Sequence, residues 1–143
     1  MEVGIVAEPG VNQDDDRTRE PPAERFAAGE LAFDLRAEIE SLKAEGPPSS
    51  AGHRQKTLYK HGDATIALFL FERGGGLPQH EAAGAVTIHV IDGWLTVTTG
   101  PGRAYDLRAG HLLALAPDIP HAVTAREQSA MVLQVHLDRN HPV

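Results

Sequence analysis

From about residue 56 onward, turn residues divide the chain into short apolar runs. Eight runs of three to eight residues, rich in Val, Ile, Leu, Thr and Tyr, alternate with turns that contain Gly, Asp or Pro. Runs of this length match β-strands, and glycine turns between them are typical of antiparallel sandwiches and barrels. Asp92-Gly93 predicts a tight hairpin between two of the runs. We therefore predict an all-β domain with strands at 57–60, 64–71, 86–91, 94–99, 104–107, 112–115, 122–124 and 130–137.

The residues before these runs follow a helical period. Four apolar residues recur at spacings of four, four and three and would form one stripe of a helix over 28–45: Leu31, Leu35, Ile39 and Leu42. Gly46 and the two prolines after it end this pattern. We expect the helix to pack on the outside of the domain, and the alternative is that its stripe binds a partner.

Length and charge limit the remaining possibilities. The 143 residues are enough for one domain, which we divide into a flexible acidic tail at 1–25, a helix and linker at 26–55 and a β-barrel at 56–143. The formal net charge of −7 argues against nucleic acid as a partner, because a phosphate backbone attracts basic surfaces. No apolar stretch approaches the ~20 residues of a membrane span, and the acidic N-terminus does not resemble a signal peptide. The chain has no cysteine, which fits the cytoplasmic location that we expect.

Five residues in the barrel region have the spacing of a known pair of motifs. Gly74 is followed after five residues by His80, and Gly93 closes this first segment; Gly110 and His121 form the second. The pattern resembles the two cupin motifs, G-x5-H-x-H-x3/4-E-x6-G and G-x5-P-x-G-x2-H-x3-N. The resemblance covers roughly residues 56–137 and is strongest to small single-domain bacterial cupins of the RmlC-like superfamily. It implies a jelly-roll β-barrel, with the predicted helix packed outside it.

The resemblance also implies a metal site, from which half of the ligands are missing. In the cupin family, two His and a Glu of the first motif and one His of the second hold a divalent metal. His80 and His121 are kept here, but Ala82 and Val86 occupy the other two ligand positions. Metal sites usually need three or four protein ligands. We therefore expect either no cofactor or a weakly bound divalent metal (Zn, Fe, Mn or Ni); without a metal, both histidines would be hydrogen-bonding groups in an apolar pocket.

Strand alternation indicates which side chains could line that pocket. If Val86 faces the barrel lumen, Ile88 and Val90 face it too, since alternate residues of a strand share one face. With Val123 they would form an apolar ligand pocket around the two histidines. Thr87, His89 and Ile91 would then face outward.

The remaining histidines supply one further ligand candidate. Gln134 and His136 share one face of the last strand, so His136 could be a third metal ligand only if that face turns to the lumen. We expect His89 near a dimer interface, because barrels of this kind often pair through exposed sheet faces or edges. The others are expected to be exposed to solvent: His53, His61, His111 and His141.

These features favour a small-molecule-binding protein. The first hypothesis is a homodimeric cupin with a largely apolar barrel pocket, an incomplete metal site, a small-molecule ligand and no nucleic-acid or membrane partner. The alternative is a metal-dependent cupin enzyme (an oxygenase, isomerase or lyase) that uses His80 and His121 with an atypical third ligand. A third possibility is a regulatory or structural barrel without a ligand. No catalytic residue can be assigned from the sequence.

Overall fold

The computed structural model describes residues 29–46 and 52–138, so the predicted acidic tail lies outside the described residues. One helix, α2, spans Leu35–Ala44. Strands follow it for the rest of the described chain: β1 (His53–His61), β2 (Ala64–Phe71), β3 (Gly76–His80), β4 (Gly84–Asp92), β5 (Trp94–Thr98), β6 (Ala104–Arg108), β7 (Leu112–Leu115), β8 (His121–Ala125) and β9 (Ser129–Leu137).

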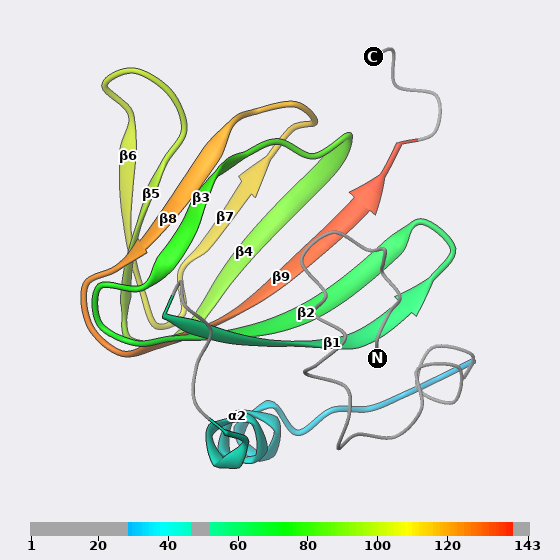
Figure 1. The fold of residues 1–143 in the computed structure, drawn as a ribbon. Coiled ribbons are helices and arrows are strands. Elements are labelled where there is room, and N and C mark those ends of the chain that lie inside the picture. The colour runs from blue at the N-terminus through cyan, green and yellow to red at the C-terminus, as the bar shows by residue number, and fades with distance from the viewer. Residues whose placement is uncertain (1–28, 47–51, 139–143) are drawn as a thin grey trace.

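The strands form two sheets that face each other (Figure 1). One sheet has five strands in the order β1-β2-β9-β4-β7, and the other has four in the order β3-β8-β5-β6. Neighbours within a sheet are antiparallel and often far apart in sequence, as β2 and β9 are. This is the jelly-roll arrangement. The prediction of an all-β jelly-roll barrel is confirmed.

An inner core fills the space between the two sheets. On β4, Val86, Ile88 and Val90 are buried and alternate with more exposed neighbours. From the opposite sheet, Leu95 and Val97 of β5 join the same cluster, and both are fully buried. Each such side chain stabilises the fold by roughly 1.5–3 kcal/mol relative to exposure. The alternation read from the sequence therefore gives the correct inward face of β4.

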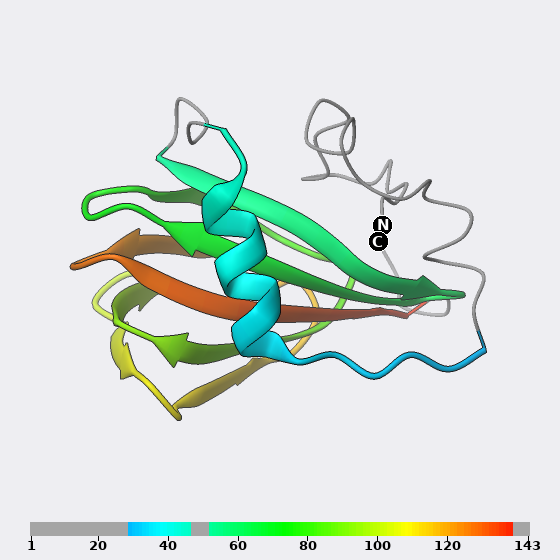
Figure 2. The ribbon, with the colours of Figure 1, turned by 90° about the horizontal axis from the view of Figure 1, so that it is seen from below.

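An outer cluster lies between α2 and the outer face of the five-stranded sheet (Figure 2). Ile39 and Leu42 of the helix are each 1% exposed. They pack on apolar residues of β1, β2 and β9: Leu58, Leu68, Leu70, Ala130 and Val132. An ion pair between Lys56 of β1 and Glu38 of the helix, 2.8 Å long, adds to this contact. The prediction of one helix packed outside the barrel is confirmed.

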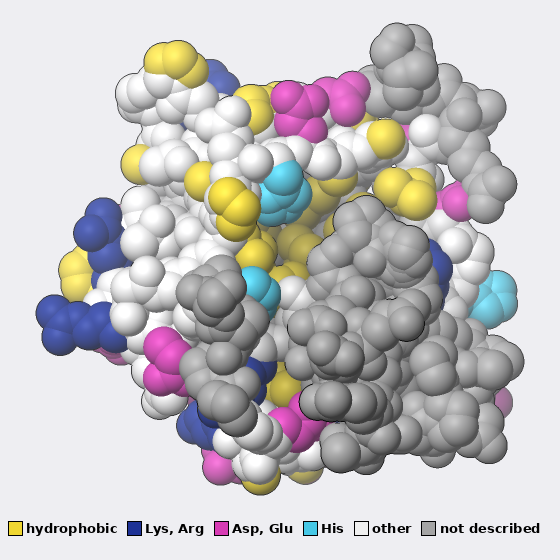
Figure 3. Space-filling model, viewed as in Figure 1, with side chains coloured by type: hydrophobic (Ala, Val, Ile, Leu, Met, Phe, Trp, Pro, Cys, Tyr) yellow, Lys and Arg dark blue, Asp and Glu magenta, His cyan; other side chains and the backbone are white. Residues whose placement is uncertain are grey.

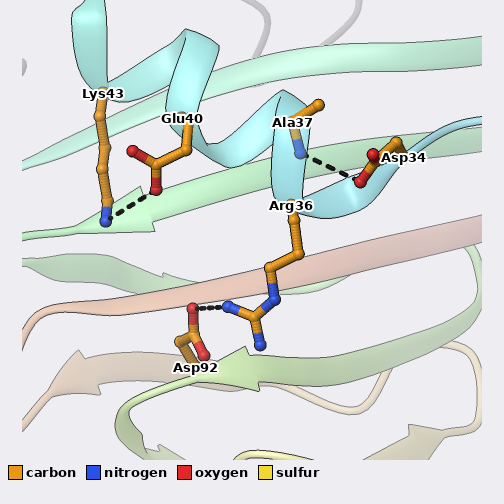
Figure 4. Close-up of polar contacts among 6 residues, drawn as sticks. All are labelled: Asp34, Arg36, Ala37, Glu40, Lys43 and Asp92. Carbon is orange, nitrogen blue, oxygen red and sulfur yellow. Dashed lines mark hydrogen bonds and ion pairs between the residues drawn. The ribbon is translucent and has the colours of Figure 1, made fainter.

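The helix is shorter than predicted because Asp34 begins it. The Asp34 carboxylate accepts a hydrogen bond of 3.1 Å from the backbone N–H of Ala37, which is the geometry of an N-cap (Figure 4). Leu31 lies before this cap and is 44% exposed, so it does not belong to the packed stripe. Arg36 in the first turn forms an ion pair with Asp92 at the end of β4. No helix of the described residues is long and apolar enough to cross a membrane.

Two strands differ from the prediction. β3 is absent from the predicted set because Gly76 and Pro78 have low strand propensity. β1 begins at His53 rather than at 57, so the barrel starts within the predicted linker. β3 lies at the beginning of the first motif and is the strand that carries His80.

The predicted hairpin at Asp92-Gly93 is a corner between the two sheets. β4 belongs to the five-stranded sheet, whereas β5, which follows directly, belongs to the four-stranded one. Gly93 has a φ of +94°, and a Cβ at this position would lie 2.2 Å from the Ser129 hydroxyl oxygen. The position requires glycine, as predicted. The prediction of a hairpin is wrong, because the chain changes sheets here.

Candidate functional site

Strand register brings His80 and His121 together. β3 pairs with β8, and in this pairing His80 lies opposite His121. Their ring centroids are 4.2 Å apart, and the ring planes meet at 62°. His121 is 2% exposed, whereas His80 is exposed at the end of its strand. These two residues form one site, the histidine pair, with one buried and one accessible ring.

A backbone carbonyl two residues earlier holds each ring of the pair. His80 Nδ1 lies 2.9 Å from the carbonyl oxygen of Pro78, and His121 Nδ1 lies 2.9 Å from that of Ile119. A carbonyl oxygen only accepts hydrogen bonds, so each Nδ1 carries the proton and each neutral ring keeps its lone pair on Nε2. No described residue pairs with either Nε2 atom. The pair thus offers two acceptor nitrogens without partners.

Burial also affects the charge of the buried ring. It lowers the pKa of His121 below the ordinary value for imidazole. The hydrogen bond to the Ile119 carbonyl opposes this shift, and the charge of His80 adds to it. His121 is therefore uncharged at neutral pH, and its Nε2 accepts a hydrogen bond or ligates a metal.

Apolar side chains lie at the end of the barrel that carries the histidine pair, which we call the mouth. Ala82, Ile119, Leu133 and Val135 are partly buried and pack against the inner core. Val135 lies opposite Val86 near the beginning of β4, which places these residues at the same end of the sheets as the loop after His80. Histidine and hydrophobic side chains lie side by side around a hollow in Figure 3. A molecule at the mouth would therefore meet two imidazoles and an apolar border.

The four apolar residues predicted to line the pocket are buried in the inner core. Ile88 and Val90 have no exposed surface, and Val86 and Val123 are 2% and 3% exposed. They face the inner core between the two sheets. The accessible apolar residues of β9, Leu133 and Val135, were missed in the sequence, because β9 carries apolar residues on both faces.

The residues around the pair do not make a complete metal site. Ala82 and Val86, at the two replaced positions of the first motif, carry no donor atom. Within residues 29–46 and 52–138, no group of three or more His, Cys, Asp or Glu side chains could hold a metal ion. The donor set among the described residues is thus two imidazole nitrogens, fewer than metal sites usually have.

His136 does not join the histidine pair. Leu133 and Val135 pack on the inner core, so Gln134 and His136, which alternate with them on β9, point outward and are exposed. The proposed third metal ligand therefore lies on the other face of the sheet. His89 is also exposed on the outer face, opposite Leu112 of β7.

The expectation that His53 is exposed is wrong. His53 lies in β1 and is partly buried, with its ring centroid 5.8 Å from that of Phe69 and from that of Phe71. Its Nε2 lies 2.9 Å from the side-chain oxygen of Gln55. The strand begins earlier than the apolar pattern indicates, which explains the error. His61 and His111 are exposed as expected, and His141 lies outside the described residues.

A separate cavity of about 110 Å³ lies beside α2, away from the histidine pair. Its lining includes Lys43, Arg54, Glu72 and Asp92. These charges have partners, for example Arg54 with Glu72 at 3.4 Å. The cavity is small and carries no charge without a partner among the described residues, so the mouth is the better candidate site.

The two facing sheets, the jelly-roll order and the position of the histidine pair define the class of protein: the chain has the cupin fold. Among solved structures it is similar to a cupin superfamily protein from Desulfitobacterium hafniense, with a TM-score of 0.64 and 18% identity over 80% of this chain and 96% of that one. It is also similar to KdgF from a Halomonas species, with a TM-score of 0.58 and 19% identity over 68% and 92% of the two chains.

A larger enzyme shares the same fold. A variant of salicylate 1,2-dioxygenase from Pseudoaminobacter salicylatoxidans has a TM-score of 0.61 and 12% identity, over 84% of this chain and 44% of that one. No protein-family model matches the sequence, and no curated protein matches it either. These similarities establish the fold. At such low sequence identities they do not assign a function, which must be argued from the residues of the site.

Proposed function

We propose that the protein binds a small organic molecule at the mouth of its barrel. The observation that carries this proposal is the histidine pair, whose two Nε2 atoms have no partner among the described residues and stand beside an apolar border. Pockets for small molecules typically combine such an apolar lining with a few convergent polar groups. The apolar border would bury the body of the ligand, and the imidazoles would orient its polar group.

We propose that a divalent metal, whether Zn, Fe, Mn or Ni, is bound weakly or not at all. His80 and His121 would be its protein ligands, and solvent would have to complete the coordination. Both rings must be neutral to coordinate, so metal affinity should fall at acid pH, where protons compete with the metal for the imidazole nitrogens.

The second candidate is a metal-dependent enzyme, an oxygenase, isomerase or lyase. The two Nδ1 hydrogen bonds to carbonyl oxygens favour it, because metal-binding histidines are commonly oriented in this way. It requires a third ligand from outside the described donor set. The fold shared with a salicylate 1,2-dioxygenase makes such chemistry compatible with the barrel but does not assign it.

Metal content separates the two candidates. The protein should be purified without an affinity tag, and its metals should be quantified in the wild type and in His80→Ala, His121→Ala and the control His136→Ala. We expect far less than one metal per chain, with no change in the control. Near-stoichiometric metal that is lost in both pair variants would contradict the proposal and favour the enzyme. Mass spectrometry of molecules released on denaturation tests for a retained ligand, which should disappear in His121→Ala.

We propose a cytoplasmic protein without nucleic-acid or membrane partners. The absence of cysteine fits the proposed location, and the net charge of −7 argues against a phosphate backbone as a partner. A homodimer is the expected assembly, with the outer face around His89 as its interface.

A further inference from the structure

The histidine pair has a defined direction of hydrogen bonding. Both Nδ1 protons point to carbonyl oxygens, of Pro78 and of Ile119, so both free nitrogens are acceptors when the rings are neutral. The His121 side chain is only 2% exposed. Its Nε2 atom nevertheless remains accessible to solvent, unlike the fully buried polar atoms without partners among the described residues. A bound group can therefore reach this acceptor. The bound group must be a hydrogen-bond donor, since two acceptors cannot form a hydrogen bond with each other.

Carboxylates near the pair also disfavour an anionic ligand. Three exposed acidic residues lie in the segments that follow β3, precede β8 and follow β9, and we call them the acidic rim: Glu81, Asp118 and Asp138. Glu81 follows His80 directly. The backbone N–H of Asp118 donates to the carbonyl of Ala82 (2.9 Å), and that of Asp138 donates to the carbonyl of Ala83 (3.0 Å). The rim thus brackets the loop beside the pair, and the exposed Glu81 carboxylate, next to His80, repels anions and attracts cations.

One cation near the mouth lies on the other sheet. Lys60 of β1 faces the lumen, because its partner Thr65 lies opposite Val135. Its ammonium group is 3.5 Å from the Thr65 hydroxyl oxygen. Lys60 therefore belongs to the five-stranded sheet, whereas the pair belongs to the four-stranded one, and it leaves the acceptor character of the pair unchanged.

We infer that the ligand presents a hydrogen-bond-donating head group, an amide, amine or hydroxyl rather than a carboxylate or phosphate, to His80 and His121. This inference rests on the proposed function and narrows it to one chemical class. The apolar body of the ligand would lie against Ala82, Ile119 and Val135, which are partly buried at the mouth. An anionic head group would meet two lone pairs and the acidic rim.

The tautomers can be tested without any ligand. In metal-free protein at neutral pH, ¹⁵N NMR of the imidazole rings should show Nδ1 protonated and Nε2 unprotonated at both His80 and His121. Assignment uses His80→Phe and His121→Phe. A protonated Nε2 on His121 would overturn the inference, because the buried ring would then be a donor.

Three probes with one apolar body test the head group. Benzamide donates two hydrogens, benzylamine is a cationic donor, and benzoate only accepts. In the presence of a chelator, we expect the first two to bind about tenfold more tightly than benzoate, the gain from roughly one net hydrogen bond. Salt should weaken benzylamine but not benzamide, because only a charged probe is attracted by the acidic rim.

Variants test whether the probes bind at the histidine pair. They also distinguish a wrong head group from a wrong binding site. Benzamide affinity should fall about tenfold in His80→Phe and stay unchanged in the outward-facing control His136→Phe. Because the His80 side chain is exposed, its replacement should leave the fold intact. Tighter binding of benzoate that His80→Phe abolishes would overturn the inference and leave the proposed function standing. If none of the probes perturbs the His80 or His121 resonances, both the inference and the proposed site are wrong.

Discussion

The two ends of the space between the sheets differ in what their side chains can contact. At the packed end, Phe71, Val90 and Leu95 are fully buried and touch only other protein atoms. At the mouth, Val135 is partly buried, His80 is exposed, and the pair has free nitrogen atoms. The comparison indicates that the packed end stabilises the barrel, whereas the mouth is open to a ligand. Substitutions at the two ends should therefore change different quantities.

The largest expected effect is at the packed end. Phe71→Ala removes a fully buried ring that packs on Phe69 and His53 and leaves a cavity, so it should lower the free energy of unfolding by about 3–5 kcal/mol. The matched change at the mouth is Leu137→Ala, where the side chain is 42% exposed and the expected cost is below about 1 kcal/mol. Urea unfolding followed by circular dichroism measures both. If both variants lowered the free energy of unfolding equally, the packed end and the mouth would not differ in their contribution to stability.

The outer cluster should behave like the packed end. Ile39 is 1% exposed beneath α2, and Ile39→Asp would bury a charge there, so we expect a loss of at least about 2 kcal/mol. The control is Ser41→Asp on an exposed position of the same helix. If the unfolding curve of Ile39→Asp matches that of the wild type, the helix stripe is free to bind a partner instead of packing on the barrel.

Much of the packed end could be predicted from the sequence, because alternation on β4 fixes which residues face inward. β9 could not be assigned in this way. Its inner face carries Met131, Leu133 and Val135, but its outer face also carries the apolar Ala130 and Val132, which pack under the helix. Apolar residues on both faces leave the period ambiguous, so the direction of His136 stayed open.

The mouth was predictable only in part. Motif spacing alone placed His80 and His121 at one site, although the strand that carries His80 was missed because Gly76 and Pro78 do not resemble a strand. The orientation of the rings depends on the carbonyls of Pro78 and Ile119. Such backbone contacts leave no pattern of residue types, so the acceptor character of the pair emerges only from the structure.

A third region lies on the outer face of the five-stranded sheet, at β7 and the part of β4 around His89, where the described side chains are exposed. Leu112 is 62% exposed there, on edge strand β7 and opposite the exposed His89. We predict a dimer through this face at micromolar concentration, measured by sedimentation. Leu112→Glu should dissociate it and change the stability of the monomer by only about 0.5 kcal/mol, whereas Leu137→Glu at the mouth should leave it intact. A monomeric wild type would contradict this prediction.

The smallest expected effect is a dependence of stability on pH that comes from the mouth alone. Burial lowers the pKa of His121 in the folded protein, whereas the unfolded chain titrates near the ordinary value of ~6.5. Below that pH the unfolded state binds a proton that the folded state does not, so the free energy of unfolding decreases until the pH passes the folded-state pKa. Comparing urea midpoints between pH 8 and pH 5.5 for the wild type and His121→Gln isolates this contribution from that of the other histidines, and the wild type should lose more stability. An equal loss in both proteins would mean that the His121 ring takes up its proton as readily as a solvated one, and that the buried half of the pair is not held neutral by its surroundings.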